Sequence, residues 1–111
     1  MAYDEELASR IRELVRGETG VTEKKMFGGL AFLVGGNMAI AASGAGGVLV
    51  RVDPAESGTL LATTNAELFE MRGRRMAGWM RVAPADVRSE QELAAWVRIG
   101  VAYARSLPAK G

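Results

Sequence analysis

The spacing of apolar residues changes several times along the chain, and each change predicts a different element of secondary structure. Near the start of the chain, apolar residues recur every three or four positions, at Leu7, Ile11, Leu14 and Val15. This spacing places them on one face of a helix. Asp4 is a suitable N-cap and Gly17 a suitable stop. We therefore predict an amphipathic helix that covers a sheet.

The following stretch has the spacing of β-strands. After a polar connection at 18–23, apolar runs of strand length end at Val34, Ala42 and Val52, and short glycine-rich turns separate them. This pattern is typical of an antiparallel meander. The first run has apolar residues on both faces, so we expect its strand to be covered on both sides.

Two glycine pairs interrupt the meander. Gly28 and Gly29 lie near the beginning of the first run and predict a bulge or a close approach of two backbones. The alternative is a phosphate-binding loop, but neither GxxxxGK[ST] nor a GxGxxG that opens a helix is present. Gly35 and Gly36 suit a tight hairpin turn, because glycine adopts positive φ angles readily.

The second half of the chain predicts, in order, a short helix, a hairpin and a long helix, at 53–62, 67–82 and 89–107. Asp53-Pro54 is a compact helix start, and the S-x-x-E sequence that begins at Ser89 is a capping box. The order α-β-β-β-α-β-β-α predicts an α+β domain with two layers. One layer is an antiparallel sheet of about five strands, and the helices lie mainly on one face of it.

Alternation along the strands divides the sheet into two faces. On the helix side we predict one buried cluster, made of Phe32, Ile40, Val50, Trp96 and Val101. The other face carries a second set of mostly apolar residues: Ala31, Leu33, Ala39, Ala41, Leu49, Ala77 and Trp79. An apolar face of this size predicts a covering partner, and we expect a two-fold homodimer. The alternatives are a helix of the same chain or a different protein.

Composition narrows the class of protein. With 111 residues, the chain predicts a single domain, 1–111. Its 14 basic and 13 acidic residues nearly cancel, so no global charge attracts it to nucleic acid or membrane. No apolar run approaches the roughly 20 residues that span a bilayer, and the start of the chain does not resemble a signal peptide. We therefore expect a cytoplasmic protein without membrane contact.

The absence of cysteine and histidine limits the chemistry. The chain has no thiolate nucleophile, no imidazole base and none of the sulfur or imidazole ligands of metal sites. Ser43 has no histidine or nearby lysine to activate it, and Lys24 and Lys25 fit a solvated strand start. An enzyme that uses carboxylates alone is the weakest alternative. We predict no catalytic residue, no metal and no cofactor.

Arginines and one tryptophan form the strongest candidate for a binding surface. Arginine forks suit carboxylates, phosphates and aromatic faces. The predicted partner-binding residues lie in the second hairpin and on a neighbouring strand: Arg51, Arg72, Arg74, Arg75, Trp79 and Arg81. The alternative is a solvated hairpin tip that protects a sheet edge from aggregation.

Several segments resemble the TfoX/Sxy N-terminal domain family. They are Lys25-Met26-Phe27-Gly28-Gly29-Leu30-Ala31-Phe32, Gly36-Asn37-Met38-Ala39, Val48-Leu49-Val50-Arg51-Val52, Gly73-Arg74-Arg75-Met76-Ala77-Gly78-Trp79, and the ending from Ala94 to Pro108. The similarity covers roughly 22–107. In this motif, Met26, Phe27, Gly28 and Gly29 are interpreted as structural residues.

The resemblance implies a two-layer α+β fold related to the secretion-chaperone-like folds. The family's namesakes regulate competence genes in bacteria with the cyclic-AMP receptor protein, and they carry a second, C-terminal domain that is not in this sequence. The resemblance therefore implies a non-enzymatic interaction module with a regulatory role and a protein partner. The alternative is that the arginines bind nucleic acid or a small anionic ligand.

Overall fold

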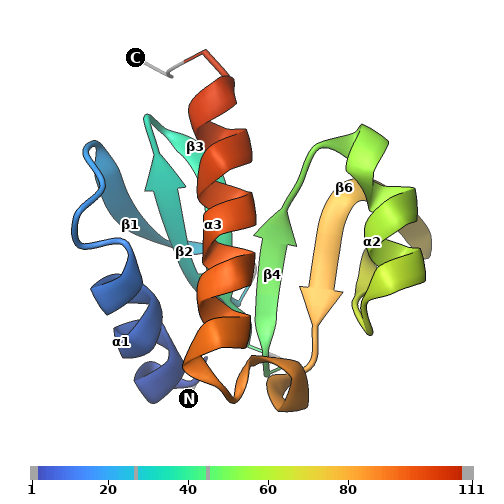
Figure 1. Cartoon of the computed structure of the whole chain (residues 1–111), viewed down its shortest axis with the longest axis horizontal. Helices are drawn as coiled ribbons and strands as arrows, with labels where there is room; N and C mark the ends of the chain where they lie inside the picture. Colours follow the sequence, from blue (N-terminus) through green and yellow to red (C-terminus); the bar gives the residue numbers. More distant parts are fainter. Residues whose placement is uncertain (1–2, 27, 45, 109–111) are drawn as a thin grey trace.

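A computed structural model describes residues 3–26, 28–44 and 46–108. Figure 1 shows a sheet with helices packed in front of it. The elements, in order, are α1 (Glu5–Leu14), β1 (Val21–Met26), β2 (Gly29–Val34), β3 (Asn37–Ala42), β4 (Val48–Arg51), the 3-10 turn η1 (Pro54–Glu56), α2 (Ser57–Thr63), β5 (Glu67–Met71), β6 (Arg74–Val82), the 3-10 turn η2 (Pro84–Val87) and α3 (Glu90–Ser106).

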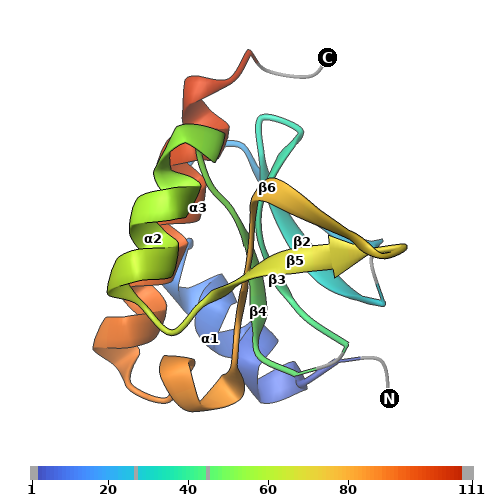
Figure 2. The ribbon, with the colours of Figure 1, turned by 90° about the vertical axis from the view of Figure 1, so that its right-hand side faces the viewer.

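The sheet has six strands in the order β1-β2-β3-β4-β6-β5, and every neighbouring pair is antiparallel. Figure 2 shows α1, α2 and α3 on one side of the sheet. The predicted α+β fold with two layers is confirmed. Among the described residues, no helix combines the length and apolar character that crossing a membrane requires.

The N-terminal part of the sheet contains one strand more than we predicted. The segment read as a polar connection and the start of the first run form a separate edge strand, β1, paired with β2 from Val21↔Val34 to Met26↔Gly29. The sequence does not indicate β1, because its central residues, 22–25, are polar and exposed and show no apolar alternation. Gly28, with φ +72°, lies at the turn between the two strands. Phe27 lies outside the described residues.

The glycine pairs occupy positions that other residues fit poorly. A Cβ on Gly29 would come within 2.0 Å of the backbone oxygen of Ala42, so the predicted close approach of two backbones is confirmed. Gly35 and Gly36 have φ angles of +59° and +84° and form the predicted turn between β2 and β3.

The main core lies between the sheet and the helices. Phe32, Ile40, Val50, Trp96 and Val101 belong to one buried cluster, as predicted. The long helix α3 lies against β3 and β4, and Gly100 allows the close approach, because a Cβ there would be 2.4 Å from the backbone oxygen of Ala39. Truncating any of the large members of this cluster would therefore leave a cavity.

Helix ends confirm the predicted caps. The Asp4 carboxylate accepts hydrogen bonds from the backbone N–H groups of Glu6 and Leu7, at 2.9 and 3.1 Å. Asp53 caps η1 through the backbone N–H of Ala55, at 3.0 Å. The Ser89 hydroxyl accepts from the backbone N–H of Glu92, at 3.0 Å, and starts α3. These bonds satisfy backbone donors that the helices leave free.

A second, smaller cluster lies on the face of the sheet opposite the helices. Ala31, Met38, Ala41 and Leu49 are at most 4% exposed there, and Met26, Leu33, Phe69 and Trp79 pack against them, partly buried. We call these eight residues and the sheet surface around them the open face. Because the larger side chains cover the smaller ones, the single chain already buries much of the area that we expected a partner to cover.

Two residues that we assigned to the open face do not belong to it. Ala77 is exposed and belongs to neither buried cluster. Ala39 lies on the other side of the sheet. Ala39 belongs to the main core, next to Ile40. The register between β2 and β3 shifts between Phe32↔Ile40 and Leu33↔Met38, so β3 contains one extra residue at this point. Such a bulge places two successive side chains on the same face, which simple alternation does not predict.

A larger irregularity bends β6. The pairing with β5 passes from Leu68↔Met80 to Phe69↔Met76, and the residues between Met76 and Met80 have no partner on β5. Within this bulge Gly78 has φ +86°, accepts a hydrogen bond from the backbone N–H of Val52 at 2.8 Å, and donates one to the Ser57 hydroxyl at 2.8 Å. Figure 2 shows β5 running across to the side of the sheet opposite the helices.

Candidate partner-binding surface

The β5–β6 hairpin presents three arginines at its tip. Arg72 and Gly73 both have positive φ angles, +55° and +78°, and form a two-residue turn between Met71 and Arg74. This is the geometry of a tight hairpin. Arg72, Arg74 and Arg75 are exposed. The turn therefore places three arginine side chains at the exposed tip of the hairpin.

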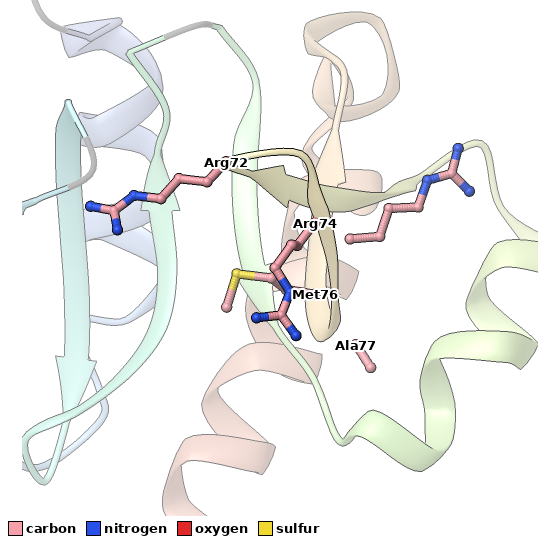
Figure 3. A pocket seen from close by; sticks show the side chains of 5 residues that line it. Arg72, Arg74, Met76 and Ala77 are labelled. Carbon is pink, nitrogen blue, oxygen red and sulfur yellow. The ribbon is translucent and has the colours of Figure 1, made fainter.

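These arginines surround a hollow of about 480 Å³, lined also by Met76 and Ala77. Figure 3 shows the side chains of Arg72 and Met76 on one side of the hairpin and that of Ala77 on the other. Within the described chain, Arg72, Arg74 and Arg75 form no ion pair and no hydrogen bond through their side chains. Their charge is therefore available to a ligand.

Ion pairs on the helix side differ from this arrangement. Arg12 makes two hydrogen bonds with Glu23, from Nε at 2.7 Å and from Nη2 at 2.9 Å. Arg105 contacts Glu18 at 2.6 Å, and Arg16 pairs with Glu13. The hydrogen bond from Arg12 holds the pKa of Glu23 below its usual value, and the same contact raises the pKa of Arg12.

Arg51 contacts two aromatic side chains, one from the sheet and one from a helix. It lies at the end of β4, half-buried, opposite Trp79 on β6. Its guanidinium carbon lies over the Trp79 ring, 5.2 Å from the centroid, and over the Tyr103 ring of α3, 5.6 Å from the centroid. Both contacts are in the range of cation–π interactions. Arg51 therefore bridges the sheet and the helix layer.

Arg81 lies in the same part of the sheet as Arg51 and Trp79. It is exposed and pairs in register with Leu49 on β4 and with Glu67 on β5. Because directly opposite residues of antiparallel strands point to the same face, Arg81 and Glu67 lie on the open face. Lys24, opposite Ala31, lies on that face by the same argument.

The six predicted residues therefore form two sets. Arg51, Trp79 and Arg81 lie on or beside the open face, whereas Arg72, Arg74 and Arg75 line the hollow at the hairpin tip. The role of both sets in binding a partner stays a prediction. Tyr103 was not predicted as part of this surface, because it lies beside the buried stripe of α3 and contacts a strand about fifty positions earlier.

Other kinds of site are not indicated by the part of the chain that the structure describes. No group of three or more acidic side chains is placed to hold a metal ion there. The absence of catalytic residues stays a prediction. The arrangement of arginines, aromatic rings and apolar side chains is suited to binding anionic or acidic groups rather than to moving protons.

Comparison with known proteins identifies a family. The family model of the TfoX N-terminal domain matches residues 13–104, which is most of the 111-residue chain. A search of curated proteins and a search of solved structures gave no match. The relation to the secretion-chaperone-like folds therefore stays a prediction.

Proposed function

The chain belongs to the TfoX N-terminal domain family, and we propose that it is a non-enzymatic interaction module that binds a protein partner. We further propose that this binding serves transcriptional regulation of the competence type, as the resemblance to the family's namesakes implies. The partner would contact the open face of the sheet and the arginine hairpin beside it.

The observation that carries this proposal is the open face itself. It combines partly exposed apolar side chains, Leu33, Phe69 and Trp79 among them, with basic residues at its border. Protein interfaces commonly have this composition, with aromatic residues and arginine enriched at the centre. On the helix side, by contrast, Arg12, Arg16 and Arg105 already contact carboxylates.

Affinity capture with matched variants tests the proposal. The immobilised protein is incubated with lysate of its host, and bound proteins are identified by mass spectrometry. We expect one or a few proteins to be enriched, and Trp79→Ala to lose most of that enrichment. Leu61→Ala is the matched control, because Leu61 is 41% exposed on α2, on the helix side. Equal enrichment by both variants would reject the open face as the binding surface.

A second candidate function is supported by the hairpin hollow. Arg72, Arg74 and Arg75 line it together and have no ion pair within the described chain, so they suit phosphate groups of nucleic acid. If three phosphates are contacted, affinity for a labelled oligonucleotide should fall about 40-fold between 50 and 200 mM salt. Arg75→Ala should reduce both the affinity and this salt dependence. An affinity that is insensitive to salt would exclude this function.

A further inference from the structure

Arg51 differs from the other arginines that contact the body of the protein. Its side chain is half-buried, and it lies over the rings of Trp79 and Tyr103. Within the described residues it donates no side-chain hydrogen bond and has no carboxylate partner. By contrast, Arg12 and Arg105 each contact a glutamate directly. A partly desolvated guanidinium without a carboxylate is unusual, because charged groups away from water are generally paired.

The two rings determine what Arg51 can bind. Aromatic faces attract the positive charge of the guanidinium, but they do not replace the acceptors that its five N–H groups require. Contact with both rings also restricts the rotation of the side chain, so less conformational entropy is lost when a ligand binds. The N–H edge of Arg51 is therefore a preorganised donor for a group with two oxygen acceptors, which a carboxylate supplies.

The surroundings of Arg51 indicate the rest of the ligand. Trp79 contacts Arg51 and also packs against the buried cluster of the open face, as do Leu33 and Phe69. A ligand that reaches Arg51 from this side would place apolar groups against these side chains. Lys24 and Arg81 lie on the same face, where Glu67 is the one acidic residue that the strand register places among the described residues. The face therefore favours an acidic partner.

We propose that Arg51 binds a carboxylate of an acidic protein segment whose apolar side chains lie on the open face. This inference rests on the proposed interaction function and specifies the chemistry of the partner. A second copy of the chain is the less favourable occupant, because two copies that met through this face would bring two predominantly basic surfaces together. Nucleic acid is less favourable because its phosphates gain little from apolar side chains.

Small probes test this chemistry on the complete, purified chain. Phenylacetate combines a carboxylate with an apolar ring, and phenylacetamide has the same shape without the charge. Both are titrated while the side-chain N–H signals of Arg51 and Trp79 are followed by nuclear magnetic resonance. We expect phenylacetate to shift both signals with saturation, and phenylacetamide to bind at least about tenfold more weakly.

Variants assign the effect to Arg51. Arg51→Met keeps an unbranched apolar side chain but removes the donors, and it should weaken phenylacetate binding about tenfold or more as followed at Trp79. Arg98→Met is the matched control and should bind normally, because Arg98 is exposed on α3, on the helix side. If Arg51→Met does not fold, Arg51→Lys, which keeps the charge but loses the fork, should still bind phenylacetate more weakly than the natural protein. Equal binding of phenylacetamide, or unchanged affinity in the Arg51 variants, would overturn the proposal.

Two further measurements separate the remaining occupants. Phenylphosphonate that binds more tightly than phenylacetate would show a phosphate site and overturn the choice of a carboxylate. A dimer that dissociates in Arg51→Met would show that a second copy occupies the face, which also overturns it. Phenylacetate binding without any captured protein would contradict the interaction function alone. A captured protein that binds Arg51→Met unchanged would contradict the role of Arg51 alone.

Discussion

At the scale of single residues, Gly29 illustrates how a missing side chain permits two strands to meet. Gly29→Ala would place a Cβ 2.0 Å from the backbone oxygen of Ala42, so β2 and β3 would have to move apart. We expect a loss of about 1–3 kcal/mol in the free energy of unfolding, measured by chemical denaturation. Gly17→Ala is the control, because no atom lies within 4 Å of its added Cβ. An unchanged stability for Gly29→Ala would contradict the close approach.

The ion pair between Arg12 and Glu23 predicts a dependence of stability on pH. Because the pKa of Glu23 is lower in the folded chain than in the unfolded one, its contribution is present above the unfolded value of about 4.3 and is lost as the pH falls through the folded value. The natural protein should therefore be more stable than Glu23→Gln at pH 6, and the difference should decrease as the pH falls below the unfolded value. Denaturant titrations of both proteins measure it. A difference that stays constant would show that the charge is irrelevant.

The helix caps and tight turns were predicted correctly, because each depends only on residues that are close in sequence. The caps at Asp4 and Ser89 and the turn at Gly35 require information from only a few positions, and the sequence contains it. The contact of Arg51 with Tyr103 could not be predicted in this way. It joins residues about fifty positions apart, and their proximity depends on how α3 lies across the sheet.

At the scale of elements, packing of α3 on the sheet determines the core. Phe32 on β2 and Trp96 on α3 are 1% and 7% exposed and belong to the same cluster. Phe32→Ala or Trp96→Ala should lower the free energy of unfolding by about 3–5 kcal/mol, because each leaves a large cavity. Leu61→Ala, on the exposed side of α2, should cost far less. A loss below about 1 kcal/mol at Phe32 or Trp96 would contradict this packing.

The errors of the sequence analysis also lie at this scale. The edge strand β1 was missed because an exposed edge carries polar residues and shows no apolar alternation. The face of Ala39 was wrong because a bulge shifts the register within β3. The order of the other elements was predictable, because α1, α3 and most strands have their own apolar period and Asp53-Pro54 marks the start of the short helix.

At the scale of the whole molecule, the homodimer predicted from the sequence remains to be measured. The apolar area that a second copy could cover is smaller than expected, because Ala31, Ala41 and Leu49 are already buried within one chain. The partly buried side chains of Leu33, Phe69 and Trp79 remain for a partner to cover. If the dimer forms, light scattering at micromolar concentration should give twice the chain mass of 11.8 kDa. The mass of a single chain would contradict the prediction. It would leave the open face available to another protein.

The sheet order has a consequence for how the chain folds during synthesis. In the described chain, four strand pairs join strands that are consecutive in sequence, and only the pairing of β4 with β6 spans a longer stretch. Loop closure for such hairpins costs little entropy, so the meander from β1 to β4 can form early. The helix α3, which covers β3 and β4, follows all six strands in the sequence. Until the ribosome has completed it, a sheet formed early would expose Phe32, Ile40 and Val50, and exposed apolar surface of this kind favours aggregation.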